Sequence, residues 1–190
     1  MIADDFLRMT KLETPWGFAS FDAATMNVIG SNVGGLRRWL EQGLEHRQLG
    51  YWMGQPLAET TQYLLFQRLV SSRYRQVVRG DILACSEFRD RLPGLLHDRK
   101  TMWVGMTAPL TLGFSAGEHL HVSKWADFER VRRMTFPRNA VVLIDAGAVG
   151  TVLAWHWYAR NPRCTILDVK GVWNSSRSSL PEAVPASPPA

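Results

Sequence analysis

The chain has 190 residues, of which 46% are hydrophobic and 21% are charged. This composition excludes a largely disordered protein and is sufficient for one domain with a substantial core. The net charge of +5 at pH 7 suits a phosphate-bearing partner, either a nucleotide or a nucleic acid, and is equally compatible with a solvated basic face.

The first residues and the two cysteines indicate the cellular compartment in which we expect the protein. The opening MIADDFLRMT lacks the basic start and apolar core of a signal peptide, and no apolar run approaches the length that spans a bilayer. Cys85 and Cys164 lie in or beside apolar runs without metal-site spacing, so we expect buried free thiols in a reducing compartment. These features predict a cytoplasmic protein without a transmembrane segment.

In the first half of the chain, helical and strand patterns alternate. We expect a short strand over 16–20 and a helix that starts near Asp22 and breaks at the glycines that follow. From 36 to 44, apolar residues recur every three or four positions, which predicts an amphipathic helix. Residues 49–53 form a candidate strand or loop, and 61–69 a further helix.

The second half has clearer strands. The pattern predicts strands over 100–106, 118–122, 140–144 and 164–169, separated by helical segments. Strands that alternate with helices imply parallel pairing through right-handed crossovers. The expected fold class is α/β, a single domain over 1–173 with a mostly parallel, Rossmann-like sheet flanked by helices. Residues 174–190, rich in Ser, Pro and Ala, are predicted to form a flexible tail.

Ligands of open parallel sheets bind beyond the carboxyl ends of the strands. Three such ends can be identified: Gly105, Met106 and Thr107; Asp145, Ala146 and Gly147; Asp168, Val169, Lys170 and Gly171. Glycine at such a turn lets the backbone approach a ligand, and free N–H groups at a following helix start suit an anion.

The turn from Asp145 to Gly150 is only part of a dinucleotide-binding fingerprint. Gly147 and Gly150 are present, but Asp145 stands where that fingerprint has its first glycine. The turn therefore indicates either a phosphate-binding segment or a tight strand-to-helix connection of a kind common in α/β proteins.

Other candidate groups have both functional and structural interpretations. Asp22 can bind a metal, act as a base or cap the following helix. His119 and His121 share a strand face, which suits a metal, but no carboxylate partner is evident. His156 lies on an apolar helix stripe and is expected to be a core histidine with a satisfied hydrogen bond. Most tryptophans are expected in the core, although Tyr51 or Trp52 can also stack on a base or sugar.

Several segments together form a recognisable order of motifs. They are ASFDAATM over 19–26, a strand that ends in Val104 and Gly105, HLHV over 119–122, the apolar strand and glycine turn over 141–150, and TILDVKG over 165–171. In this order they resemble the GT-D-type glycosyltransferases, an α/β family of bacteria and phages that uses nucleotide sugars. The first and last motifs of that family are like R-[FY]-G-D-G-E-[FW] and A-[IL]-D-[IV]-G-[SH].

The resemblance covers about 16–173 and is strongest from Arg99 onward. It implies a nucleotide-sugar donor held across the strand ends. The acceptor is not identified: the basic surface is compatible with a nucleic acid, and a protein or a glycan is equally compatible. The resemblance implies that Asp22 contacts the diphosphate or its metal, and that Asp168 or Asp145 binds hydroxyls or serves as the base for the acceptor. The residues expected to bind the nucleotide are Gly105, Thr107, Asp145, Gly147 and Gly150.

One departure from the family concerns the metal. Its paired acids are thought to hold a divalent cation; Asp22 matches the first acid, whereas Ala24 stands in place of the second. One carboxylate can suffice for Mn²⁺ or Mg²⁺ besides phosphate oxygens and waters, or an arginine or lysine can replace the metal. The alternatives to a glycosyltransferase are a non-catalytic nucleotide-binding or assembly module on the same fold and a basic nucleic-acid-binding protein.

Overall fold

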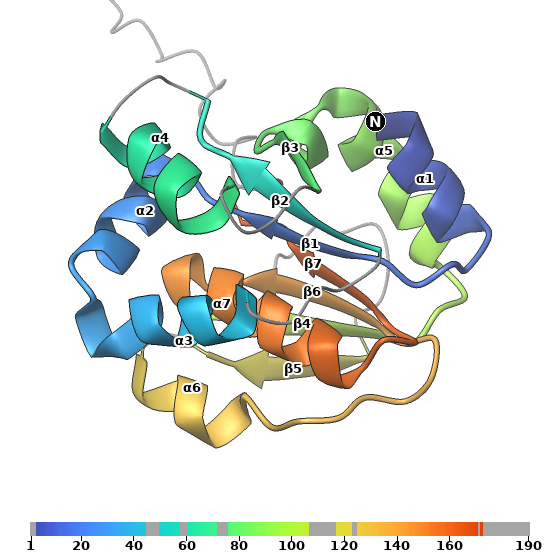
Figure 1. Ribbon diagram of the computed structural model, residues 1–190. Helices are drawn as coiled ribbons and strands as arrows, with labels where there is room; N and C mark the ends of the chain where they lie inside the picture. The colour runs from blue at the N-terminus through green and yellow to red at the C-terminus, as the bar shows by residue number, and fades with distance from the viewer. Residues whose placement is uncertain are drawn as a thin grey trace, which may run out of the picture.

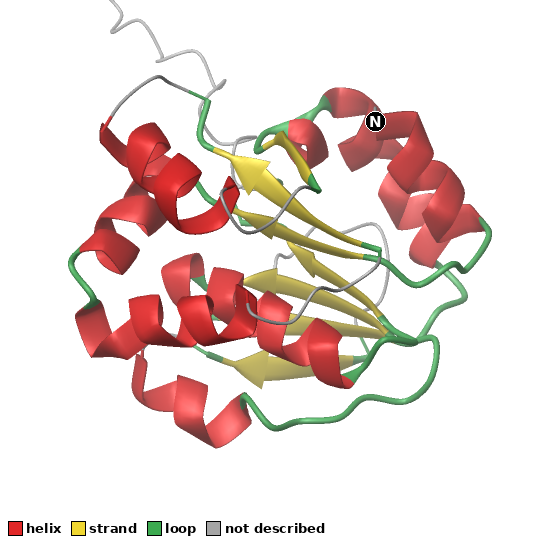
Figure 2. Ribbon diagram, in the orientation of Figure 1, coloured by secondary structure: helices red, strands yellow, loops and turns green. Residues whose placement is uncertain are grey.

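A parallel sheet organises the molecule. The computed structural model describes residues 3–44, 50–57, 61–71, 76–106, 117–122, 125–170 and 172. Within them a seven-stranded sheet has the order β3-β2-β1-β7-β6-β4-β5, and every neighbouring pair is parallel. Helices cover both faces (Figures 1 and 2). The expected α/β fold is confirmed, with a wholly parallel sheet. The predicted tail over 174–190 lies outside the described residues.

The elements have the following bounds. The strands are β1 (Gly17–Ser20), β2 (Tyr51–Gln55), β3 (Val77–Arg79), β4 (Thr101–Gly105), β5 (Glu118–His121), β6 (Val141–Asp145) and β7 (Thr165–Asp168). The α-helices are α1 (Ala3–Lys11), α2 (Ala23–Gly30), α3 (Leu36–Leu44), α4 (Thr61–Phe66), α5 (Ser86–Leu96), α6 (Trp125–Val131) and α7 (Gly147–Arg160). The short helical turns are η1 (Val33–Gly35), η2 (Gln67–Ser71) and η3 (Ile82–Ala84). None of the described helices has the length and apolar character needed to cross a membrane.

Two of these elements were not predicted from the sequence. Helix α1 has nine residues and buries Phe6, Leu7 and Thr10, which is too short a segment to show a helical apolar period. Strand β3 has three residues at the edge of the sheet, too few for an alternating pattern. Both elements depend on packing against distant parts of the chain rather than on local pattern.

The sheet separates two apolar clusters, and β6 contributes to both. Val142 and Ile144 belong to a cluster with α2, α3, α4, α6 and α7, which we call the α7 face. Val141 and Leu143 belong to a cluster with α1, α5 and Val172, which we call the α5 face. Because successive strand residues point to opposite sides, the uninterrupted apolar run of β6 is typical of a strand buried on both faces.

The direction of the chain across the sheet explains this division. The chain runs from β1 to β2 and β3 in one direction, crosses to β4 and β5, and returns through β6 to β7. The stretches from β1 to β3 and from β5 to β7 cross the sheet in the same direction, so right-handed crossovers put their helices on the α7 face. Helix α5 joins β3 to β4 in the opposite direction, so it lies on the opposite face. The clusters and the ribbon in Figure 1 agree with this arrangement.

Aromatic residues predicted to contact either the core or a ligand lie in the core. Tyr51 and Trp52 are 0% and 8% exposed and face opposite sides of the sheet, so the idea that one of them stacks on a base or sugar is wrong. Cys164 is a buried free thiol as expected, and Cys85 is a partly buried one.

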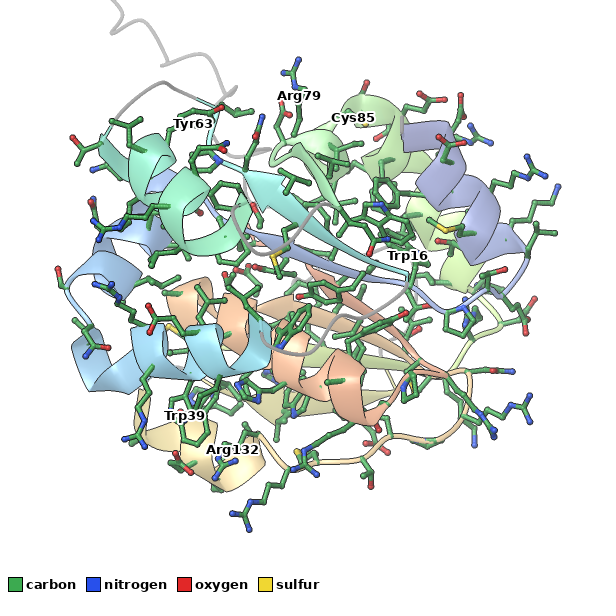
Figure 3. All side chains as sticks on the ribbon, viewed as in Figure 1. Trp16, Trp39, Tyr63, Arg79, Cys85 and Arg132 are labelled. Atoms are coloured by element: carbon green, nitrogen blue, oxygen red, sulfur yellow. The ribbon has the colours of Figure 1, made fainter. Side chains whose placement is uncertain are left out.

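Helices α3, α6 and α7 meet around His156. Its Nε2 donates to the carbonyl oxygen of Trp39 at 3.3 Å, and its ring lies against Trp39 and Phe128 with centroids 5.6 and 5.4 Å away. The Arg132 guanidinium lies 4.3 Å from the centroid of the Trp39 ring, and Figure 3 shows these two side chains together. The prediction of a core histidine with a satisfied hydrogen bond is confirmed.

The environment of His156 disfavours its charged form. Burial lowers its pKa below 6.5, and the hydrogen bond to the Trp39 carbonyl opposes this effect. The charges of Arg132 and Arg160 lower the pKa further, and Glu129 has the smallest, opposing effect. At pH values between this lowered pKa and 6.5, His156 is therefore protonated to a greater extent in the unfolded chain than in the folded chain.

We expect the free energy of unfolding to fall as the pH drops below 6.5, because protonation at His156 favours the unfolded state. Denaturant unfolding at a series of pH values should show this slope, and His156→Gln should reduce it. His97 is exposed at the end of α5, so His97→Gln should keep the full slope. Equal slopes in both variants would contradict this assignment.

Two helical glycines have opposite surroundings and allow a matched comparison. Gly43 on α3 is buried, and a Cβ there would overlap the indole of Trp155, whereas a Cβ at Gly94 on α5 would meet nothing within 4 Å. We expect Gly43→Ala to lower the free energy of unfolding by about 1–3 kcal/mol through overpacking. Gly94→Ala should raise it by about 0.5–1 kcal/mol through backbone entropy. Denaturant midpoints measure both; a neutral Gly43→Ala would contradict the close approach of α3 to α7.

Candidate functional site

The neighbouring strands β1 and β7 separate at their carboxyl ends. The β1–β7 pairing stops at Phe18 and Leu167, whereas β1 continues to pair with β2 through Ser20 and β7 with β6 through Asp168. Beyond this point the chain leaves β1 toward the α7 face and leaves β7 toward the α5 face. The two strands therefore separate at their carboxyl ends, which is the edge of an open parallel sheet where ligands bind.

The carboxyl group of Asp168 replaces the backbone hydrogen bonding that β1 and β7 do not continue beyond Phe18 and Leu167. Its Oδ2 accepts the N–H of Ser20 at 3.1 Å and lies 2.8 Å from the hydroxyl of Thr151 on α7. The same hydroxyl lies 3.1 Å from the carbonyl oxygen of Ser20. The carboxyl group of Asp168 thus holds β1, β7 and α7 together where the ladder has ended.

Complete burial sets the electrostatics of Asp168. Its side chain is 0% exposed, and its Oδ1 has no hydrogen-bond partner of ordinary geometry within the described part of the chain. Burial raises the pKa of this carboxyl group, and the charge of Lys170, the Thr151 hydroxyl and the N–H groups of Ser20 and Lys170 oppose the rise. A carboxyl group in this position needs a positive neighbour to remain ionised.

Lys170 is that neighbour. Its Nζ donates to the hydroxyl oxygens of Thr25 at 2.5 Å and Thr151 at 2.7 Å. It lies 3.5 Å from Asp168 Oδ2 and 3.6 Å from Asp22 Oδ2, and the lysine side chain is only 9% exposed. One ammonium group therefore joins residues from α2, α7 and the ends of β1 and β7.

Asp22 is the exposed member of this group. It is the N-cap of α2, where its Oδ1 accepts the N–H of Thr25 at 2.7 Å, and its side chain is 49% exposed. Partial burial acts to raise its pKa, but the charge of Lys170 and the hydrogen bonds from Thr25 outweigh burial and lower it. We call this cluster the β1/β7 junction; its members are Ser20, Asp22, Thr25, Thr151, Asp168 and Lys170.

The junction brings together two of the residues predicted from sequence, Asp22 and Asp168, and four that were given no role. Lys170 stands two residues after Asp168, so its place at a strand end was visible, but nothing local indicated its partners. Thr25 and Thr151 gave no signal, because their meeting depends on α2 and α7 packing side by side (Figure 1).

The remaining predicted residues lie at the neighbouring strand ends. Gly105 and Asp145 are paired across β4 and β6, and a Cβ at Gly105 would lie 2.5 Å from the Asp145 carbonyl oxygen. A Cβ at Gly150 would lie 2.8 Å from Ile144, so this glycine allows α7 to pack closely on β6. Close packing of the chain itself accounts for both glycines. Thr107 lies outside the described residues.

Gly147 differs from these two glycines. It begins α7 with a φ of +54°, and a Cβ there would meet nothing within 4 Å. The N-cap residue, Ala146, supplies no side-chain cap to this 14-residue helix. The first N–H groups of α7 can therefore donate to an anion, and Thr151 connects the same turn to Lys170.

The donor set does not fit a divalent cation. Asp22 has no second acid beside it, since Ala24 stands there, and no group of three His, Cys, Asp or Glu side chains in the described ranges is placed to hold a metal. The Lys170 ammonium already lies within 3.6 Å of both carboxylates. His119 and His121 are exposed on the edge strand β5, and His119 Nε2 donates to the Gly105 carbonyl oxygen at 3.1 Å.

A cavity of about 280 Å³ lies at the other edge of the sheet. Its lining includes Lys100 and Thr101 at the start of β4 and Glu118 at the start of β5. Because it is at the amino ends of the strands, it is separate from the β1/β7 junction, and we place the candidate site at the junction on the chemistry of the side chains.

Two buried threonines test the junction. Thr151→Val should lower the free energy of unfolding by about 1–3 kcal/mol, because it removes the hydroxyl shared by Lys170, Asp168 and Ser20. The hydroxyl of Thr165 on β7 is buried without a hydrogen-bond partner among the described residues, so Thr165→Val should be neutral or slightly stabilising. Denaturant unfolding compares the two; the opposite order of stabilities would contradict the hydrogen-bond pattern.

No family model and no curated protein matches the chain. Among solved structures, a glycosyltransferase (DUF1792) from Streptococcus sanguinis is similar, with a TM-score of 0.66, 12% identity, and coverage of 97% of this chain and 86% of that one. Two further DUF1792 structures, one described as having a distinct glycosyltransferase fold, have TM-scores of 0.61, 11% identity, and coverage of 93% and 79%. The chain therefore has the fold of the DUF1792 glycosyltransferases, the GT-D-type fold that its motifs predicted.

Proposed function

We propose that the protein is glycosyltransferase-like: it binds a nucleotide-sugar donor at the carboxyl edge of the sheet and transfers the sugar to an acceptor. The observation that carries the proposal is the convergence of charged and polar groups from β1, α2, α7 and β7 at the carboxyl ends of the strands. The similarity to solved glycosyltransferases supports it through the fold.

In this proposal, residues of different elements have different roles. The N–H groups at the start of α7, beside Gly147, bind a phosphate of the donor, and Asp22 contacts the diphosphate from the start of α2. Asp145 lies at the end of β6, is partly exposed, and binds a sugar or ribose hydroxyl or takes the proton of the acceptor hydroxyl. Asp168 is fully buried, so it positions Lys170 and β1 rather than touching the acceptor. Thr107 remains a proposed phosphate contact.

The reaction replaces one bond to the anomeric carbon with another. The bond from that carbon to the diphosphate oxygen breaks, the acceptor oxygen bonds to the carbon, and the acceptor proton passes to Asp145. The nucleoside diphosphate leaves with increased negative charge, so positive groups and N–H donors aimed at it stabilise the transition state. The acceptor can be a nucleic acid, a protein or a glycan.

The second candidate is a non-catalytic nucleotide-binding module on the same fold. Ala24 and the tight pairing of Lys170 with two carboxylates favour it, since both differ from a paired-acid metal site. This candidate predicts nucleotide binding without turnover. A nucleic-acid-binding protein predicts instead an affinity for DNA or RNA that falls steeply with salt.

We expect UDP- or GDP-sugars to raise the melting temperature and to be hydrolysed slowly without an acceptor. Asp145→Asn should lower the hydrolysis rate roughly a hundredfold, because it removes the proposed base. Asp90 is exposed on α5, so Asp90→Asn should change neither quantity. Melting curves and release of free nucleotide measure both effects.

Two other outcomes of these measurements would contradict the proposed catalysis. Stabilisation by a nucleotide without hydrolysis would favour the non-catalytic module. The absence of both stabilisation and hydrolysis, with and without Mn²⁺, would remove the proposed function.

A further inference from the structure

The position of Lys170 bears on how the donor diphosphate is held. Its ammonium lies between the carboxylates of Asp22 and Asp168, 3.6 and 3.5 Å from the nearer oxygens. A divalent cation held by those same oxygens would lie next to a fixed positive charge. The lysine stem is buried, and two threonine hydroxyls hold the ammonium in place, so it is not free to swing away.

The sequence departs from the family pattern in two compensating ways. Ala24 removes one negative charge where the pattern has an acid, and Lys170 adds one positive charge where the pattern has a glycine. With a divalent cation, the paired acids of the pattern are neutral together. Here Lys170 lies beside both Asp22 and Asp168, and the three groups together carry a charge of −1. The two acids of the first motif, the acid of the last motif and a divalent cation also carry −1 together, so the two changes remove the need for a metal.

The ammonium retains the capacity to bind a ligand. Two of its three N–H groups are directed to the hydroxyls of Thr25 and Thr151. The two carboxylate oxygens lie beyond the usual length of about 2.9 Å for an N–H···O hydrogen bond, so the third N–H has only distant acceptors. The lysine side chain is 9% exposed and Asp22 is half exposed, so a phosphate oxygen would approach the ammonium from the side of Asp22.

We propose that Lys170 takes the place of a divalent cation, so that this protein binds the diphosphate of a nucleotide sugar without a metal. The inference rests on the proposed function, because it concerns the same donor. Asp168 and the two threonines position the ammonium, Lys170 contacts a phosphate oxygen, and the start of α7 contributes N–H groups through the same turn that carries Thr151.

The first test is calorimetric titration of the full chain with UDP and GDP, after removal of metals with EDTA and again with Mg²⁺ or Mn²⁺. We expect one of the nucleotides to bind with the same Kd, within about twofold, in both conditions. Lys170→Met should weaken that binding at least tenfold, and Lys170→Arg should retain part of it. Lys100→Met removes an exposed lysine at the opposite edge of the sheet and should leave the Kd unchanged.

A second variant covers the case in which Lys170→Met unfolds the chain by leaving Asp168 unpaired. The double change Lys170→Met and Asp168→Asn removes both charges, and circular dichroism reports whether it folds. We expect the folded double variant to bind the nucleotide at least tenfold more weakly. Binding as tight as that of the unaltered protein would overturn the inference and make Lys170 a structural residue only.

The two proposals fail in different ways. If electron paramagnetic resonance detects Mn²⁺ bound to the unaltered protein, and Mn²⁺ is required for UDP or GDP to bind, the inference is overturned and the proposed function stands. If neither nucleotide binds in any condition, the proposed function is overturned and the inference with it.

Discussion

The replacement of a backbone hydrogen bond by the carboxyl group of Asp168 is the constraint on which the junction depends. Once Ser20 donates to a side chain instead of to a strand, β1 and β7 separate at their carboxyl ends. The carboxyl group that permits this is fully buried, and a buried charge is costly unless it is paired and hydrogen-bonded. Lys170 and Thr151 meet that requirement, and their positions in turn decide which other groups belong to the junction.

This separation occurs between two strands that are far apart in the sequence. The two strands are neighbours in the sheet but lie near opposite ends of the sequence, and the chain leaves them toward opposite faces. Helices α2 and α7, which follow β1 and precede β7, lie on the same face and bring Thr25 and Thr151 to one ammonium group. The apolar clusters on the two faces hold these helices and strands together, so Ser20, Thr25, Thr151 and Asp168 lie on packed elements, and Asp22 and Lys170 follow directly after β1 and β7.

The likeness to solved glycosyltransferases at 11–12% identity shows how little of such a fold depends on particular side chains. A parallel sheet with this strand order needs apolar strands, close helix packing at a few glycines and right-handed connections. The charged groups at the β1/β7 junction are separate from these requirements, so they can differ while the fold is kept. The exchange of an acid for Ala24 and the presence of Lys170 are differences of this kind.

The sequence by itself determined most of the elements and the side of the sheet on which a ligand is expected. An uninterrupted apolar run identified the strand predicted over 140–144, which is β6, and apolar periodicity identified the helix over 36–44. It missed α1 and β3, which are too short to show a period. Only the tertiary structure decided that Lys170 reaches Thr25, 145 residues away, and lies between Asp22 and Asp168. That meeting follows from the order of strands in the sheet, which no local pattern encodes.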